Sequence, residues 1–136
     1  MQAIERHSFP DTTVPTAYGA YSHAVVAGDF VFLSGQIARD PTGEFVGGDV
    51  ASQTKRSIEI VADILGRFDL TLADVVRCTV YLADIADFPA MNGVFAEAFG
   101  ATFPARSTPQ VQMPYGAKIG LEVTAFRGSQ PHGTQP

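Results

Sequence analysis

The chain has 136 residues, of which 46% are apolar and 17% are charged, as is typical of a packed globular domain. A chain of this length buries roughly two thirds of its unfolded surface, so a core forms without disulfide bonds or structural metals. Nine basic and 14 acidic side chains give a net charge of −5, which disfavours binding to nucleic acid.

The N-terminal part of the chain predicts a short strand around residues 3–7, a long loop over residues 10–22, and then a β-hairpin. The hairpin strands, residues 24–27 and 30–33, flank a Gly-Asp pair that is typical of a two-residue turn. Both strands carry adjacent apolar residues, so each face of the hairpin requires burial. Too few helices follow to cover both faces, and we therefore expect the chain to associate with copies of itself.

Two helices are predicted from the spacing of apolar residues. Asp49 is the expected N-cap of the first, whose apolar positions recur at helical spacing up to Leu65. The second begins near Asp87, which is expected to cap it, with Pro89 in its first turn. Gly100 is expected to end this second helix.

The rest of the chain favours strands. Residues 75–82 and 119–126 are long alternating runs, and residues 105–113 are a weaker one. Because strands outnumber helices, we expect an α+β fold in which two helices pack on one face of a mixed sheet. The sequence predicts a single domain over residues 1–127 and a disordered tail over residues 128–136, which are rich in Gly, Pro, Ser and Gln.

Two charged residues are candidates for chemistry. In the last strand, alternate apolar residues share one face and Glu122 lies on the other. If the apolar face packs on the helices, Glu122 points toward the expected subunit interface, where its carboxylate is paired, solvated or functional. Arg106 offers a planar fork that binds a carboxylate, although an isolated arginine is more often an ordinary surface residue.

Metal, redox and membrane functions find no support in the sequence. Cys78 is the one cysteine, and its place in an apolar strand predicts a small buried side chain. His7, His23 and His132 lack metal-ligand spacing, so no metal site is expected. No stretch approaches the ~20 apolar residues that span a bilayer, and the first residues lack a signal-peptide pattern. We therefore expect a cytoplasmic protein.

A series of motifs carries a family resemblance from about Ala20 to Phe126. In chain order they are AYGAYSHAV, VFLSGQI, DPTGE, GGDVASQT, DVVRCTVYLAD, DFPAMNGVF, FPARS and KIGLEVTAF. In this order the motifs resemble the RidA family, also called the YjgF family. The resemblance implies a chorismate mutase-like fold that assembles as a homotrimer, with the sheets forming a central barrel and three clefts at the subunit interfaces.

The resemblance also implies an activity, the hydrolysis of reactive enamines or imines to a 2-keto acid and ammonia. The implied substrates are small 2-imino acids, such as 2-aminoacrylate or its imine tautomer, which pyridoxal-phosphate enzymes release. The family itself is expected to use no cofactor, and neither nucleic acid nor membrane is an expected partner.

Roles are assigned by matching single residues to the family motifs. Arg106 resembles the arginine that binds the substrate carboxylate, Glu122 the glutamate that positions or activates the attacking water, and Tyr21 the tyrosine that lines the cleft and assists catalysis. The further substrate-binding residues that the resemblance implies are Ser34, Gly35, Asn92 and Thr108.

The chain departs from the family pattern near this site. Gly19-Ala20 stands where many members have Gly-Pro, so we expect a less rigid loop at Tyr21. Thr108 replaces a frequent cysteine, and Gly120 replaces a glutamate two residues before the catalytic one. These departures leave the identity of the substrate open.

Three alternative functions follow from the same resemblance. One is a pathway-specific deaminase that acts on an aminomuconate-type intermediate and has a larger pocket. Another is a non-catalytic module that binds 2-keto acids, since a fold does not fix a function. A ribonuclease role has also been attached to the family, but the net charge of −5 disfavours it.

Overall fold

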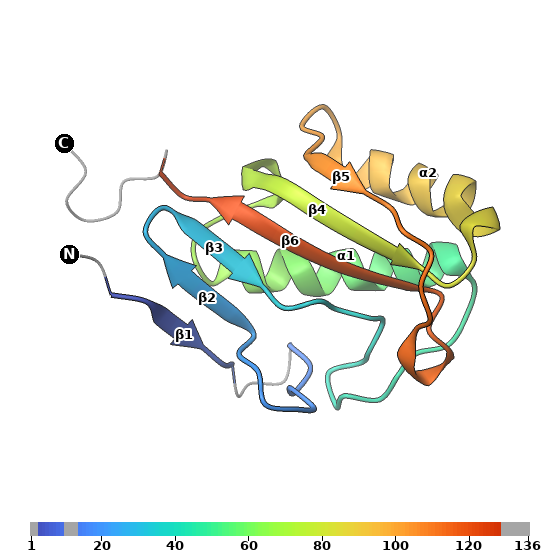
Figure 1. The fold of residues 1–136 in the computed structure, drawn as a ribbon, viewed down its shortest axis with the longest axis horizontal. Helices are drawn as coiled ribbons and strands as arrows, with labels where there is room; N and C mark the ends of the chain where they lie inside the picture. The colour runs from blue at the N-terminus through green and yellow to red at the C-terminus, as the bar shows by residue number, and fades with distance from the viewer. Residues whose placement is uncertain (1–2, 10–13, 129–136) are drawn as a thin grey trace.

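In the computed structural model, which describes residues 3–9 and 14–128, six strands form one mixed sheet in the order β1-β2-β3-β6-β4-β5. Both helices lie on the same side of this sheet (Figure 1). All neighbouring strands are antiparallel except β4 and β5, which are parallel. The elements are β1 (Glu5–His7), β2 (Ala24–Ala27), β3 (Phe30–Leu33), α1 (Val50–Gly66), β4 (Val75–Leu82), α2 (Phe88–Phe99), β5 (Ala105–Ser107) and β6 (Ile119–Phe126). This arrangement confirms the expected α+β layer.

The N-terminal hairpin forms as predicted. Gly28 adopts a φ of +60°, which suits the tight turn between β2 and β3. Strand β1 pairs with β2 and forms one edge of the sheet. Residues 14–22 form a loop, as expected, whereas residues 10–13 and, apart from Gly128, the tail predicted over residues 128–136 lie outside the described residues.

The predicted cap of the first helix is confirmed, whereas Asp87 holds the predicted N-cap position of the second helix without a capping side-chain bond. The side chain of Asp49 accepts a hydrogen bond from the Ser52 amide at 2.8 Å. Asp87 is itself the last residue of a short 3₁₀ turn that the side chain of Asp84 caps, and its backbone is helical where that of Asp49 is extended. Neither helix in the described part of the chain is long and apolar enough to cross a membrane.

Strand β5 is shorter than the predicted run of residues 105–113. It ends at Ser107, and the chain then follows the end of β4 through isolated contacts. Leu82 donates to the Pro109 carbonyl at 3.0 Å, and Val111 donates to Leu82 at 2.9 Å. A regular ladder cannot continue here because Pro109 has no amide hydrogen.

The core lies between the helices and one face of the sheet. As predicted, the alternate apolar residues of β6 face the helices, and the side chain of Glu122 lies on the opposite, open face. The largest buried core residues are Ile60, Ile64 and Leu65 of α1, Leu82 of β4, Met91 of α2, and Ile119 and Leu121 of β6.

The open face of the sheet carries uncovered aromatic side chains. Phe30 and Phe32 are 40% and 46% exposed. The alternate residues of the same strand, Val31 and Leu33, are buried. The Phe30 ring also lies 5.4 Å from the ring of Phe126, measured between centroids. The hairpin is therefore apolar on both faces, and the chain covers only one of them.

Candidate functional site

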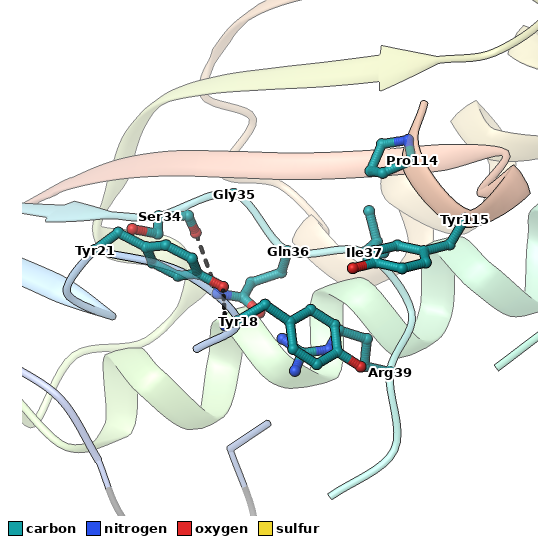
Figure 2. Close-up of a pocket in the computed structure, with 9 residues that line it drawn as sticks. All are labelled: Tyr18, Tyr21, Ser34, Gly35, Gln36, Ile37, Arg39, Pro114 and Tyr115. Carbon is teal, nitrogen blue, oxygen red and sulfur yellow. Dashed lines mark hydrogen bonds between the residues drawn. The ribbon is translucent and has the colours of Figure 1, made fainter. Parts of the chain in front are cut away.

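Three of the predicted site residues line one cavity of about 410 Å³ (Figure 2). Tyr21 comes from the loop over residues 14–22, and Ser34 and Gly35 follow directly after β3. The remaining lining residues are Tyr18, Gln36, Ile37, Arg39, Pro114 and Tyr115. The structure thus brings together a cluster of tyrosines and the exposed backbone at the end of a strand.

Hydrogen bonds connect the loop over residues 14–22, which carries Tyr21, to the end of β3. The hydroxyl of Ser34 donates to the Ser22 carbonyl at 2.6 Å, and the Ser34 amide donates to the carbonyl of His23 at 3.0 Å. The Tyr21 hydroxyl accepts from the amide of Tyr18 at 3.1 Å. The phenol of Tyr21 therefore has a defined place at the rim of the cavity.

Arg39 is a second support for this loop, which sequence reasoning missed. Its guanidinium lies 3.7 Å from the centroid of the Tyr18 ring, and only 4% of the residue is exposed. The guanidinium donates to the Gly43 carbonyl at 3.0 Å and also to the Thr16 carbonyl. The Tyr18 hydroxyl donates to the same Gly43 carbonyl. Arg39 thus fixes the loop that lacks the usual proline.

Replacing Arg39 with alanine is expected to lower the free energy of unfolding by about 2 kcal/mol. The change removes the stacking on Tyr18 and leaves the Thr16 carbonyl without its donor. Urea unfolding at one fixed protein concentration measures the loss. As a matched control, the exposed Arg6 of β1 is replaced in the same way and is expected to change the value by less than ~0.5 kcal/mol. Equal unfolding midpoints for the two variants would contradict the role of Arg39.

Glu122 lies beside this cavity, in a groove of about 220 Å³ on the open face of the sheet. A Cβ atom placed on Gly35 would lie 3.9 Å from the Cβ of Glu122, so that the two residues adjoin. Two hydrogen bonds between Gln36 and Leu121, of 2.8 and 3.0 Å, tie the end of β3 to β6 at this point. The structure therefore brings Glu122 together with Gly35 at the border of the tyrosine-lined cavity.

Tyr81 is a partner of Glu122 that sequence reasoning also missed. Its hydroxyl donates a hydrogen bond to the Oε1 atom of Glu122. This bond, together with partial burial and the charge of the carboxylate, raises the pKa of Tyr81 above its usual value. The alternation of β4 places Tyr81 on the open face, but the sequence does not show which residue of β6 stands opposite.

Arg106 and Asn92 line a different cavity, of about 320 Å³, next to α2. The guanidinium of Arg106 lies 4.7 Å from the ring centroid of Phe95 and 5.3 Å from that of Phe88. Both rings belong to α2, so the Arg106 side chain is on the helix side of the sheet.

The register of the strands supports this separation of Arg106 from Glu122. Arg106 pairs with Cys78, which faces the core, whereas Glu122 pairs with Thr79 on the other face. One chain therefore holds the two candidate catalytic groups on opposite faces of its sheet. Thr108 lies just beyond β5, is half-buried, and lines none of the cavities described here.

Cys78 and His23 are buried in surroundings that indicate structural roles. Cys78 is fully buried, as predicted, and burial raises the pKa of its thiol to about 12. The buried His23 accepts from the Phe9 amide at 2.9 Å through Nδ1, and its Nε2 lies 2.8 Å from the Pro15 carbonyl oxygen. Over residues 3–9 and 14–128, no group of three or more His, Cys, Asp and Glu side chains is placed to hold a metal ion.

Comparisons with known proteins agree with this architecture. The model of the Endoribonuclease L-PSP family matches residues 12–127. The chain is 45% identical over 115 residues to a RutC family protein of Pyrococcus abyssi, covering 83% of this chain and 91% of that protein. It is 36% identical over 130 residues to the human 2-iminobutanoate/2-iminopropanoate deaminase, covering 94% and 95% of the two chains.

Solved structures show the same fold. A putative endoribonuclease of Thermotoga maritima superposes with a TM-score of 0.84 at 39% identity, covering 90% of this chain and 97% of that one. Escherichia coli TdcF, solved with bound serine, gives a TM-score of 0.80 at 35% identity and covers 90% and 99%. These likenesses confirm the chorismate mutase-like fold that the resemblance implied.

Proposed function

Because this chain belongs to the RidA family, whose family model is described as Endoribonuclease L-PSP, we propose that it is a hydrolytic deaminase of small 2-imino acids. The observation that carries the proposal is the position of Glu122, a half-buried carboxylate in a groove that adjoins Gly35 and the Tyr21 cavity. A carboxylate held in this way is suited to binding a water and accepting its proton.

The proposed site is formed between copies of the chain in a homotrimer. Arg106 and Glu122 occupy opposite faces of one sheet, so a single copy does not direct both at one small substrate. The uncovered Phe30 and Phe32 favour burial of the open face against a neighbouring copy. In this arrangement Arg106 of one copy faces Tyr21, Ser34, Gly35 and Glu122 of the next.

The proposed mechanism follows from these roles. Arg106 binds the substrate carboxylate through two parallel N–H groups, which fixes the C=N carbon near Glu122 of the neighbouring copy. A water bound to Glu122 adds to the carbon of the N-protonated imine while the carboxylate accepts a proton of the water, and the C=N electron pair moves to nitrogen to give a neutral carbinolamine.

Glu122 then returns the proton to the amino nitrogen, which becomes a leaving group. The C–N bond breaks, and an electron pair of the hydroxyl oxygen forms the C=O bond. The hydroxyl proton leaves with the departing ammonia, so that an iminium ion and water give a 2-keto acid and ammonium. No electrons are transferred to another molecule, and water is the only co-reactant that this proposal requires.

The deaminase activity is tested with imines that are generated in the assay mixture. An amino-acid oxidase acting on alanine supplies 2-iminopropionate, and semicarbazide traps the imine that has not been hydrolysed. We expect the protein to suppress the trapped signal in proportion to its concentration. If a folded protein suppresses no signal over a panel of amino acids, the deaminase proposal fails, and binding of 2-keto acids becomes the better explanation.

The trimer is tested by placing a charge on the open face. Phe32→Glu is expected to convert a trimer into monomers, because assembly would bury carboxylates without partners. Sedimentation velocity measures the change, with Glu97→Lys on the exposed surface of α2 as a control that stays trimeric. A wild-type protein that sediments as a monomer would contradict the proposed assembly.

One observation favours a second candidate, a deaminase for a larger imino dicarboxylate of the aminomuconate type. The cavity of about 410 Å³ is large for a three-carbon acid, and Arg39 lines it. Within residues 3–9 and 14–128, no carboxylate pairs with this buried cation. Comparing kcat/KM for a three-carbon imine and a six-carbon imino dicarboxylate separates the two candidates. A preference for the longer substrate would support the second one.

The ribonuclease activity named in the description of the family model has less support. A net charge of −5 works against holding a polyphosphate backbone. RNA degradation by purified protein that is lost in an Arg106→Ala variant would reverse this ranking.

A further inference from the structure

Tyr81 makes a polar contact with Glu122 that the family resemblance does not assign. The phenol comes from β4 and donates its hydrogen bond across to β6, at the Oε1 atom of the carboxylate. Both residues are half-buried on the open face of the sheet. The bond occupies one carboxylate oxygen and leaves the other, Oε2, for a water in the groove.

The register of the sheet explains how this contact arises. Tyr81 stands opposite Gly120, and Thr79 stands opposite Glu122. Glu122 is therefore the diagonal neighbour of Tyr81 on the same face, at a distance that a tyrosine side chain spans. The contact is a consequence of antiparallel pairing between the two longest strands.

Gly120 stands opposite Tyr81 and adds no side chain to the face of the sheet that carries Tyr81 and Glu122. A Cβ atom at this position would lie 2.9 Å from the Met113 methyl, which would have to shift, and in ordinary contact with Ile37 at 3.5 Å. A glutamate here, which the family resemblance led us to expect, would require the Met113 side chain to move. It would also place a second negative charge on the same face as Glu122, where Tyr81 instead supplies a neutral donor.

The geometry points to Tyr81 as a positioning residue, whose phenol holds the carboxylate of Glu122 in the orientation that directs the attacking water. This inference rests on the proposed deaminase function. The raised pKa of Tyr81 supports it, because the phenol stays protonated, and remains a donor, at the pH of imine hydrolysis. A fixed carboxylate lowers the cost of placing the water beside the C=N carbon.

The test is Tyr81→Phe, which keeps the ring and removes only the hydroxyl. We expect kcat for the imine substrate to fall about ten- to a hundredfold, as for other lost hydrogen bonds to a charged group. KM is expected to stay within about twofold, because the carboxylate of the substrate is bound by Arg106. In a Glu122→Gln background, the same substitution is expected to have little further effect on kcat.

A titration tests the hydrogen bond without any turnover. The chain has four tyrosines, and ultraviolet absorbance of the phenolates at rising pH is expected to show a group that ionises above the usual range of a tyrosine. Glu122→Gln is expected to lower the pH at which this group ionises, since the first cause of the shift is removed. Arg77, the other charged residue that lines the groove, is unchanged in both proteins.

The outcomes distinguish this inference from the function on which it rests. If the wild-type protein hydrolyses no imine, the deaminase proposal fails and the role of Tyr81 fails with it. If the wild-type protein is active and Tyr81→Phe has the same kcat, only the role of Tyr81 is overturned. An equal loss of kcat in the wild-type and Glu122→Gln backgrounds also overturns it, because the effect would then not pass through the carboxylate.

Discussion

Replacing Arg106 with alanine is expected to lower kcat/KM for 2-iminopropionate by about a thousandfold. The substrate carboxylate would lose both of its charge-assisted hydrogen bonds, and none of the other described residues that line the Arg106 cavity is a cation. The loss is expected in KM as well as kcat, because the same contact binds the substrate and orients its C=N carbon. The imine-trapping assay measures both constants.

Two further variants test whether the loss of activity is due to the guanidinium group of Arg106. Arg106→Lys keeps the charge but not the planar fork, and we expect it to recover only part of the loss. Arg6→Ala removes an exposed arginine from the edge strand β1 and is expected to retain full activity. Thermal unfolding shows whether Arg106→Ala still folds without its stacking on Phe95. A folded Arg106→Ala protein with wild-type kcat/KM would falsify the assignment of the carboxylate-binding role.

Mixed trimers of two variants with severely reduced activity are expected to regain activity. Co-expressed Arg106→Ala and Glu122→Gln chains would form some clefts in which an intact Arg106 of one copy faces an intact Glu122 of the next. Each mixed trimer, whichever variant is present twice, has one such intact cleft out of three, so kcat per cleft of the purified mixed trimers should approach a third of the wild-type value. The prediction follows from the opposite faces on which the two side chains lie.

Different affinity tags on the two chains allow the mixed trimers to be purified and assayed. Each variant alone, assembled as a homotrimer, serves as the inactive control. Mixed trimers that stay as inactive as these controls would mean that both groups come from the same copy, and the proposed arrangement of the interface would be wrong.

Local patterns in the sequence were sufficient for most of the fold. The Asp49 cap and the apolar spacing up to Leu65 depend on neighbours a few residues apart, so they determined α1 correctly. Alternation likewise assigned Glu122 to the face of β6 away from the helices. The prediction for residues 105–113 was too long, because apolar alternation outweighed the effect of Pro109 on the ladder.

The site was predictable only in part, since its contacts join distant segments. The resemblance supplied Arg106 and Glu122 but not their separation, which depends on the parallel pairing of β5 with β4 after the α2 crossover. Tyr81 required the register between β4 and β6, and Arg39 required the contact of two loops. The spacing of residues along the chain does not reveal this strand register or this contact between loops.

The burial of Cys78 has a consequence for the durability of such an enzyme. The imine tautomer of 2-aminoacrylate has an electrophilic C=N carbon, and thiolates are strong nucleophiles among protein side chains. The chain has a single cysteine, which is fully buried, and burial raises the pKa of its thiol to about 12, so that the thiol stays protonated at neutral pH. If the protein is the proposed deaminase, its single thiol is therefore kept from reacting with the imine that the protein hydrolyses.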